Sequence, residues 1–595
     1  MTDTPNYKLD NMARKALKRR EQRGEILSSE PEKALDMILE APSPATLVQS
    51  FPDQDLYYLM HRIGVHDFAP VLAMASSTQW EYILDVEVWD DDRLDTGMMA
   101  QAFAQLFKAD PQRLLRWSIS EKPDFLEFFL FHNMQVHIRE HDEPPPSDFE
   151  DYTTLDDKFY FRFPDKSPDP SPDGENGEEI LPQTPPREHA PFEDTPELIE
   201  NMLKSLAEMD LSVFHGLLLE TLALMPSESE EEQFRLRNLR LAEKGFLPPH
   251  EAVGIYQPSR FSDLRKRPGN GSTTPVYDPE TPLPPQFFAG FITGDSLFVN
   301  ALAQVDDQER HLELQNELAA LINKIISADK IKIRNRESVE NTMEKANAFL
   351  SLGLEVLLDG EIHTGKAAQL LRTYFLEDIF RTGSGAGIQL KIRAGQWYRN
   401  SFLEKNNLPL SFLGEAYLGV VGGLLIQRPM FFSNYADKEL YRHFSALQDI
   451  RSTERLLEEI MDLDGFLGGL PIDMETFTQG VLTYKSVILT LWVRDRLGLQ
   501  LDEADALLSL APVPMDGFRQ FFTDLFQGDT GIAEDRAGNL GLWAAEISGR
   551  TPQDLSPSFQ AVLYALVREL EEEYGHVKPE GLDPRFIPHI LLETD

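Results

Sequence analysis

The chain has 595 residues, and its 99 acidic residues against 56 basic ones give a formal net charge of −43 at neutral pH. This charge argues against non-specific binding to nucleic acid, which needs Lys and Arg to displace counterions, and against docking on an anionic membrane surface. A hydrophobic content of 42% is typical of a globular protein. The length exceeds one ordinary core, so we expect about two to four domains.

The chain contains no cysteine, which removes disulfides, thiol nucleophiles, iron–sulfur clusters and Cys-type zinc sites. The first 29 residues hold no apolar segment of the kind found in secretory signals. The longest apolar run, Tyr417–Ile426, is about half of what a bilayer span requires. We therefore expect a cytoplasmic protein without membrane insertion and without a nucleic-acid partner.

Residues 1–29 form a basic N-terminal arm that carries Arg14, Lys15, Lys18, Arg19, Arg20 and Arg23. One interpretation is a docking arm for an acidic partner or for the protein's own acidic body. The other is a terminal helix exposed to solvent.

Residues 30–95 consist of short amphipathic segments, each opening on Ser, Thr, Asp or Pro before apolar residues at helical spacing. Helices are expected at 32–40, 43–51, 52–63, 65–75 and 76–86, with Gly64 as a C-cap. Helices this short must stack on their neighbours to be stable. The pattern therefore predicts a helical repeat domain over residues 30–163.

Three phrases in this stretch carry a resemblance: Ser43-Pro-Ala-Thr-Leu-Val, Phe51-Pro-Asp-Gln-Asp-Leu and Ala75-Ser-Ser-Thr-Gln-Trp-Glu. They resemble the short-helix superhelix in the cytosolic N-terminal domain of bacterial magnesium transporters and in the flagellar switch protein, over residues 30–122. Two longer phrases are Gln79-Trp-Glu-Tyr-Ile-Leu-Asp and Phe129-Leu-Phe-His-Asn-Met-Gln-Val-His-Ile-Arg-Glu-His-Asp. These are similar to an uncharacterised bacterial family known only as a domain of unknown function, a resemblance that spans most of the chain and implies no activity.

The end of the repeat domain contains one more expected helix and a strand candidate, and a second, larger domain follows it. A helix is expected at 125–139, and residues 152–163 are the best strand candidate because Phe159, Phe161 and Phe163 alternate with other residues. Residues 164–196 predict an acidic, Pro-rich linker, and 197–595 an irregular α-helical domain with a Pro/Gly-rich insertion at 257–286. Helices are expected at 197–224, 364–381, 388–404 and 439–447, among others, with the Gly-rich stretch 383–387 as a flexible turn. No strand–helix alternation is found, so the fold class is mainly α.

The string His137-Ile-Arg-Glu140-His141 resembles the H-x-x-E-H motif of the inverzincin metallopeptidases. On one helix face the two histidines could reach a single Zn²⁺, Glu140 could activate the metal-bound water, and Glu220 is a candidate third ligand. The motif runs straight into three prolines at 144–146. We therefore favour a His-rich surface at a helix end, where charge pairs with the helix dipole.

Asp90, Asp91 and Asp92 form a carboxylate run between expected helices. Such a run could hold Mg²⁺, but cation loops space their ligands and add further oxygens. A helix N-terminus or a solvated turn is the favoured alternative.

No assembled catalytic motif stands out beyond these strings, since there is no G-x-S-x-G elbow. The sequence therefore predicts a non-enzymatic protein-interaction scaffold or regulatory protein, with a protein partner and no cofactor. The alternatives are a zinc-dependent hydrolase and a divalent-cation sensor.

Overall fold

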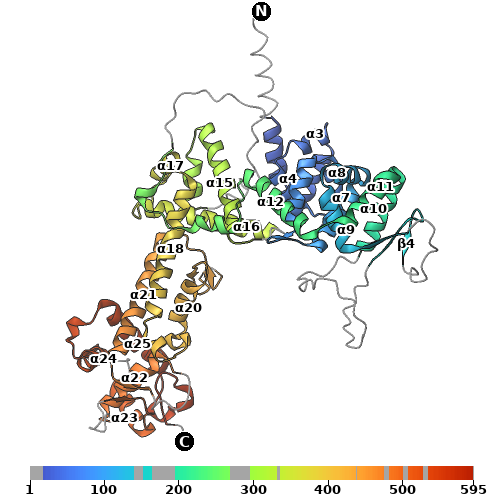
Figure 1. Ribbon diagram of the computed structural model, residues 1–595. Coiled ribbons are helices and arrows are strands. Elements are labelled where there is room, and N and C mark those ends of the chain that lie inside the picture. Colours follow the sequence, from blue (N-terminus) through green and yellow to red (C-terminus); the bar gives the residue numbers. More distant parts are fainter. Residues whose placement is uncertain are drawn as a thin grey trace, which may run out of the picture.

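The computed structural model describes residues 18–139, 152–163, 194–267, 295–331, 336–436, 438–474, 482–499, 507–526 and 534–593. Helices dominate these ranges, and the strands form only small sheets of two or three (Figure 1). The predicted fold class, mainly α, is confirmed.

Residues 18–247 form a first group of helices and strands, which we call the N-terminal lobe. It begins with a helix over 18–28 and continues with α2 (Pro31–Leu39), α3 (Pro44–Gln49), α4 (Asp53–Ile63), α5 (Ala69–Met74), α6 (Ser77–Glu87), α7 (Thr96–Ala109), α8 (Pro111–Glu121), α9 (Pro123–Asn133), α10 (Thr195–Met209), α11 (Leu211–Ala223) and α12 (Pro226–Glu243). Its strands are β1 (Trp89–Asp90), β2 (Arg93–Leu94), β3 (Gln135–Ile138), β4 (Thr153–Thr154) and β5 (Phe159–Arg162). Helices α10 and α11 follow the predicted linker in sequence, yet they pack against α7, α8 and α9.

The five short helices α2–α6 lie where the sequence predicts helices, because local capping signals mark their ends. Ser76 caps α6 by accepting the Gln79 backbone N–H, and the Gln79 side chain accepts the Ser76 N–H in return. Gly64 ends α4 at a φ of 112°, which a residue with a side chain rarely adopts. The buried Trp80 indole donates to the carbonyl of Leu72 at 2.9 Å, which ties α6 to α5.

The strand predicted within 152–163 is confirmed as β5, with which the short strand β4 pairs antiparallel. The helix predicted over 125–139 is wrong beyond Asn133, because β3 follows there and pairs antiparallel with β5. Phe159 and Phe161 are fully buried, and the third strand completes the sheet in which they lie. Pairing with a distant strand thus overrides the local helical pattern.

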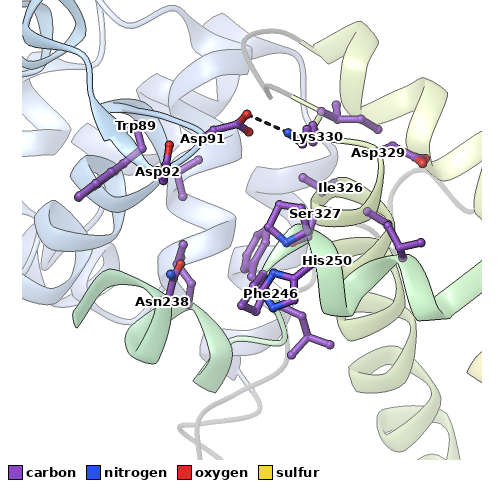
Figure 2. Close-up of a pocket in the computed structure, with 18 of the residues that line it drawn as sticks. Trp89, Asp91, Asp92, Asn238, Phe246, His250, Ile326, Ser327, Asp329 and Lys330 are labelled. Atoms are coloured by element: carbon purple, nitrogen blue, oxygen red, sulfur yellow. Dashed lines mark hydrogen bonds and ion pairs between the residues drawn. The ribbon is translucent and has the colours of Figure 1, made fainter. Parts of the chain in front are cut away.

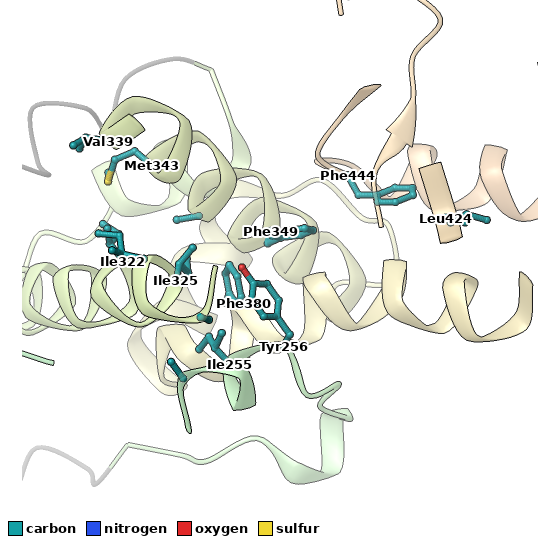
Figure 3. Packing of buried hydrophobic residues seen from close by; sticks show 14 of the residues in the cluster. Ile255, Tyr256, Ile322, Ile325, Val339, Met343, Phe349, Phe380, Leu424 and Phe444 are labelled. Atoms are coloured by element: carbon teal, nitrogen blue, oxygen red, sulfur yellow. The ribbon is translucent and has the colours of Figure 1, made fainter. Parts of the chain in front are cut away.

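Residues 248–373, the central lobe, comprise α13 (Pro249–Ala252), η1 (Val253–Tyr256), η2 (Phe261–Asp263), α14 (Leu297–Ala303), α15 (Gln308–Ala328), α16 (Arg336–Leu357) and α17 (Thr364–Thr373). The long helix α18 (Leu376–Tyr398) packs closely on α16 and runs on to the C-terminal elements (Figure 1). Figure 3 shows the shared core, where Tyr256, Ile325, Phe349 and Phe380 meet.

The stretch 383–387, predicted as a flexible turn, lies inside α18, so that prediction is wrong. Its glycines serve close helix packing. A Cβ at Gly383 would overlap the Phe349 carbonyl oxygen on α16, and a Cβ at Gly353 would overlap that of Ile379 on α18. Small residues at such a crossing let two helix backbones approach each other.

The C-terminal lobe, residues 402–593, contains α19 (Phe402–Lys405), η4 (Leu410–Leu413), α20 (Gly414–Leu425), β6 (Phe431–Phe432), β7 (Tyr441–Arg442), α21 (Leu447–Gly468), β8 (Ile472–Asp473), α22 (Tyr484–Arg496), β9 (Leu508–Ser509), α23 (Met515–Leu525), α24 (Glu534–Ile547), η6 (Pro552–Asp554), α25 (Pro557–Tyr574), η7 (Pro579–Gly581) and η8 (Pro584–Phe586). The helix predicted at 439–447 is wrong, because this segment forms β7, which pairs with β6. Within the described ranges, no single helix combines the length and apolarity needed to cross a membrane. By length and composition alone, the bent pair 376–405 and 410–425, which meet at 96°, passes that test together.

Candidate functional site: a cavity between the N-terminal and central lobes

The residues of the H-x-x-E-H string do not share a helix. His137 lies exposed on strand β3, opposite Tyr160 of β5. Glu140 and His141 fall outside the described residues. The prediction that His137 lies on a helix, one turn from His141, is therefore wrong. The proposed zinc site of His137, Glu140, His141 and Glu220 is not tested as a whole and stays a prediction.

Glu220, the predicted third ligand, lies exposed on α11 among other carboxylates. Burial, together with the charges of Asp124 and Glu220, raises the pKa of Glu127 to about 6. Among the residues that the structure describes, no group of three or more His, Asp or Glu side chains is arranged to hold a metal ion.

The carboxylate run Asp90–Asp92 lies at the β1–β2 hairpin, where Asp91 adopts a φ of 54°. This is the turn that the sequence favoured over a cation loop. The Asp91 carboxylate accepts a hydrogen bond from the Lys330 ammonium of the central lobe at 2.8 Å. The run therefore contributes a contact between two lobes.

The described part of the basic arm packs on the protein itself. Ile26 and Leu27 are buried, and Arg23 donates to the Ser50 carbonyl at 2.5 Å. Arg20 reaches Gln315 of the central lobe at 2.8 Å. The described residues of the arm therefore pack partly on the protein through neutral hydrogen-bond acceptors, and both interpretations of the arm stay predictions.

A cavity of about 880 Å³ lies where the N-terminal and central lobes meet. Figure 2 shows Trp89, Asp91 and Asp92 on one side and Ile326, Ser327, Asp329 and Lys330 on the other. Its apolar lining comes from Val86, Trp89, Phe234, Leu241, Phe246, Leu247, Pro248, Pro249, Val253, Ile326 and Ile331. Its charged lining comes from Asp91, Asp92, Arg237, Asp329, Lys330, Lys345 and Arg428, with His250 as a further titratable side chain.

Arg237 of α12 provides a half-buried cation in one wall of this cavity. Its Nε donates to the backbone carbonyl of Asp85 at 2.7 Å, and its guanidinium lies 5.3 Å from the centre of the Trp89 ring. The Asp85 carboxylate is held elsewhere, by two hydrogen bonds from Arg240 at 2.7 and 2.8 Å. Burial lowers the pKa of Arg237 to about 10, which leaves it charged at neutral pH.

The opposite wall is organised around Asp329 at the end of α15. Its carboxylate accepts hydrogen bonds from Lys345 at 2.6 Å, Tyr256 at 2.7 Å and Arg428 at 3.0 Å. Two cations thus share one carboxylate, and the Arg428 guanidinium also lies 3.9 Å from the centre of the Tyr256 ring. The cluster carries a net positive charge.

The ionisation behaviour of this cluster follows from burial. Burial alone would raise the pKa of Asp329, but the charge and hydrogen bond of Lys345, followed by the other donors, outweigh it and lower that pKa. Burial lowers the pKa of Lys345 despite the attraction of Asp329. Burial and the charge of Lys345 lower the pKa of the neighbouring His443 to about 4, which keeps this imidazole neutral at physiological pH.

Sequence reasoning missed this site, because its members are spread from residue 86 to residue 428. The sequence of α16 contained one indication of a buried polar site. Lys345 lies on the same helical face as the buried Thr342, Ala346 and Phe349, where a charged side chain is unusual. A lone cation on an apolar stripe indicates a buried partner, without saying which residue it is.

Comparisons with curated proteins and with solved structures find no match to this chain. A family model does match it, over residues 11–593, nearly the whole length. The chain therefore belongs to DUF6178, a family of unknown function.

Proposed function

We propose that this protein is a non-enzymatic interaction scaffold or regulatory protein, whose N-terminal lobe binds another protein. The observation that carries this proposal is a group of exposed apolar side chains around α11. We call this group the α11 edge; it comprises Met209, Leu211, Leu219, Leu222 and Met225, each between 37 and 59% exposed. Several exposed apolar side chains on one helix and its ends are typical of protein interfaces.

The charge around the α11 edge indicates the kind of partner. Glu208, Asp210, Glu220 and Glu228 are all exposed on the same helices or their junctions. Burial first, and then the charges of Asp124 and Glu220, raise the pKa of Glu127 on the neighbouring helix α9. An apolar centre with an acidic rim fits a protein surface that has apolar contact residues surrounded by Lys and Arg.

Full-length protein carrying Leu219→Asp and Leu222→Asp tests this proposal. The wild-type protein is used to capture partners from its native cells, and each near-stoichiometric partner is purified and titrated against both proteins. We expect at least about a tenfold loss of affinity in the variant, since interface residues at apolar centres carry most of the binding energy. Affinity should also fall as salt screens the acidic rim.

Leu542→Asp is the matched control, because Leu542 is 54% exposed on α24 in the C-terminal lobe. This variant should bind like the wild-type protein. Equal affinity of the α11-edge variant and the wild type for every purified partner would overturn the proposal, as would the absence of any partner at physiological salt.

A further inference from the structure

We propose that the cavity between the N-terminal and central lobes binds a small organic anion, with its oxyanion group at Arg237 and its apolar, planar part against the aromatic wall. This small-molecule site is separate from the α11 edge. It rests on the donors left available by Arg237, on the charge of the opposite wall and on the shape and chemistry of the lining.

Arg237 offers unused hydrogen-bond donors at a partly buried position in the cavity wall. Its Nε is committed to the Asp85 carbonyl, and its Nη1 has only a long contact of 3.5 Å with Asn238. Within the described ranges, no acidic side chain forms an ion pair with it. A half-buried guanidinium without a carboxylate partner presents a planar fork that matches a carboxylate or phosphate group.

The charges of the other residues that line the cavity do not neutralise the positive charge of Arg237. The four cations Arg237, Lys330, Lys345 and Arg428 face the three carboxylates Asp91, Asp92 and Asp329, which leaves one positive charge among these seven side chains. Asp91 is engaged by Lys330, and Asp329 by three donors. A positive cavity in a chain of net charge −43 therefore concentrates anions locally while the surface repels them.

The apolar lining selects an organic ligand over a bare inorganic ion. The Trp89 and Phe234 rings lie 5.6 Å apart, and Arg237 lies over the same Trp89 ring. The apolar part of an organic ligand can pack against this wall while its anionic group reaches the guanidinium beside it. The volume of about 880 Å³ lies within the range of small-molecule pockets.

Matched probes that differ only in charge test the proposal on the full-length protein. These are 2-naphthoate and its neutral analogue 2-naphthamide, titrated by calorimetry. We expect saturable binding of about one naphthoate per chain, and affinity for naphthamide lower by about tenfold or more, because a hydrogen bond to a charged group is lost. A further titration with 1-naphthyl phosphate determines whether the oxyanion is a carboxylate or a phosphate.

Arg237→Gln should reduce the affinity for naphthoate by about tenfold or more and leave naphthamide almost unchanged. Arg235→Gln is the matched control, since Arg235 lies two residues away on the same helix with its side chain 73% exposed. It should bind both probes like the wild type.

Val253→Trp provides a second variant that leaves the charges intact. Val253 lines the cavity and is 43% exposed, so a larger ring there should obstruct the entrance and weaken both probes. Equal affinities for naphthoate and naphthamide, or undiminished naphthoate binding by a folded Arg237→Gln variant, would overturn the proposal. Failure to bind either probe at millimolar concentration would overturn it as well, whatever the α11-edge titrations show.

Discussion

Lys345 shows how much one buried side chain can contribute to the central lobe. It is 6% exposed, and its ammonium is one of two cations on Asp329. We predict that Lys345→Met lowers the free energy of unfolding by about 3 kcal/mol, because a buried carboxylate then loses its shortest charged partner. Urea unfolding followed by circular dichroism measures the loss.

Lys366→Met is the comparison for that experiment. Lys366 pairs with Glu361 at 2.5 Å, but both side chains are more than half exposed. An exposed pair of this kind contributes about 1 kcal/mol at most. Similar losses in the two variants would contradict a special role for the Asp329 cluster.

Glu127 provides a test that depends on pH. Its folded-state pKa of about 6 lies above its ordinary value of 4.5, so the folded protein favours the protonated form. Above pH 6 the ionised carboxylate therefore destabilises the fold. As the pH falls from 6 to 4.5 this cost disappears, because the folded state takes up its proton first.

We predict that Glu127→Gln stabilises the protein at pH 8 by up to about 1 kcal/mol, after solvent screening, and has no effect at pH 4. Thermal unfolding at a series of pH values measures the difference. Glu580→Gln, at an exposed position near the C-terminus, should show no such pH dependence. A stabilisation of Glu127→Gln that is the same at pH 4 and pH 8 would contradict the assignment.

At the scale of single elements, the packing of α16 on α18 makes the sharpest prediction. Gly383→Ala should destabilise the protein by about 1–3 kcal/mol, because the added methyl group overlaps the backbone of α16. Gly395→Ala on the same helix meets no atom within 4 Å and should instead stabilise by up to about 1 kcal/mol, through helix propensity. Urea unfolding of both variants measures the contrast, and equal effects would contradict close packing at Gly383.

Some secondary-structure elements could be predicted from the sequence, and others could not. The helices α2–α6 were predictable because their signals are local: a proline or serine at the start, an apolar stripe, and Gly64 at an end. The stretch 383–387 has the composition of a turn, and only the neighbouring backbone of α16 explains why it is helical. Strand β3 likewise depends on a partner more than twenty residues away.

At the scale of the whole molecule, the net charge of −43 should govern the response to salt. We predict that the thermal midpoint rises as sodium chloride increases from about 0.01 to about 0.1 M, because the Debye length falls from about 30 to about 10 Å and self-repulsion weakens. Differential scanning calorimetry measures the shift. Sucrose at equal osmolarity is the control, and a midpoint that falls with salt would show that ion pairs outweigh the net repulsion.

The arrangement of the lobes was beyond prediction from the sequence. Helices α10 and α11 complete the N-terminal lobe although they follow the predicted linker at 164–196, and no local pattern specifies that packing. The cavity combines side chains from α12, α15, α16 and the segment after α20. Such a site exists only once distant helices have docked, so its residues carry no shared motif.

The geometry of α18 has a mechanical consequence. Its 23 residues form a continuous helix of about 35 Å. This helix packs closely on α16 at Gly383, and it also contacts α20 and α21. Because the close contact at Gly383 leaves no space for sliding, a tilt of α16 by about 5° would displace the C-terminal end of α18, about 22 Å beyond Gly383, by about 2 Å. Lys345 lies on α16 in the wall of the cavity, so a small tilt of α16 at this wall would be transmitted along α18 to the C-terminal lobe.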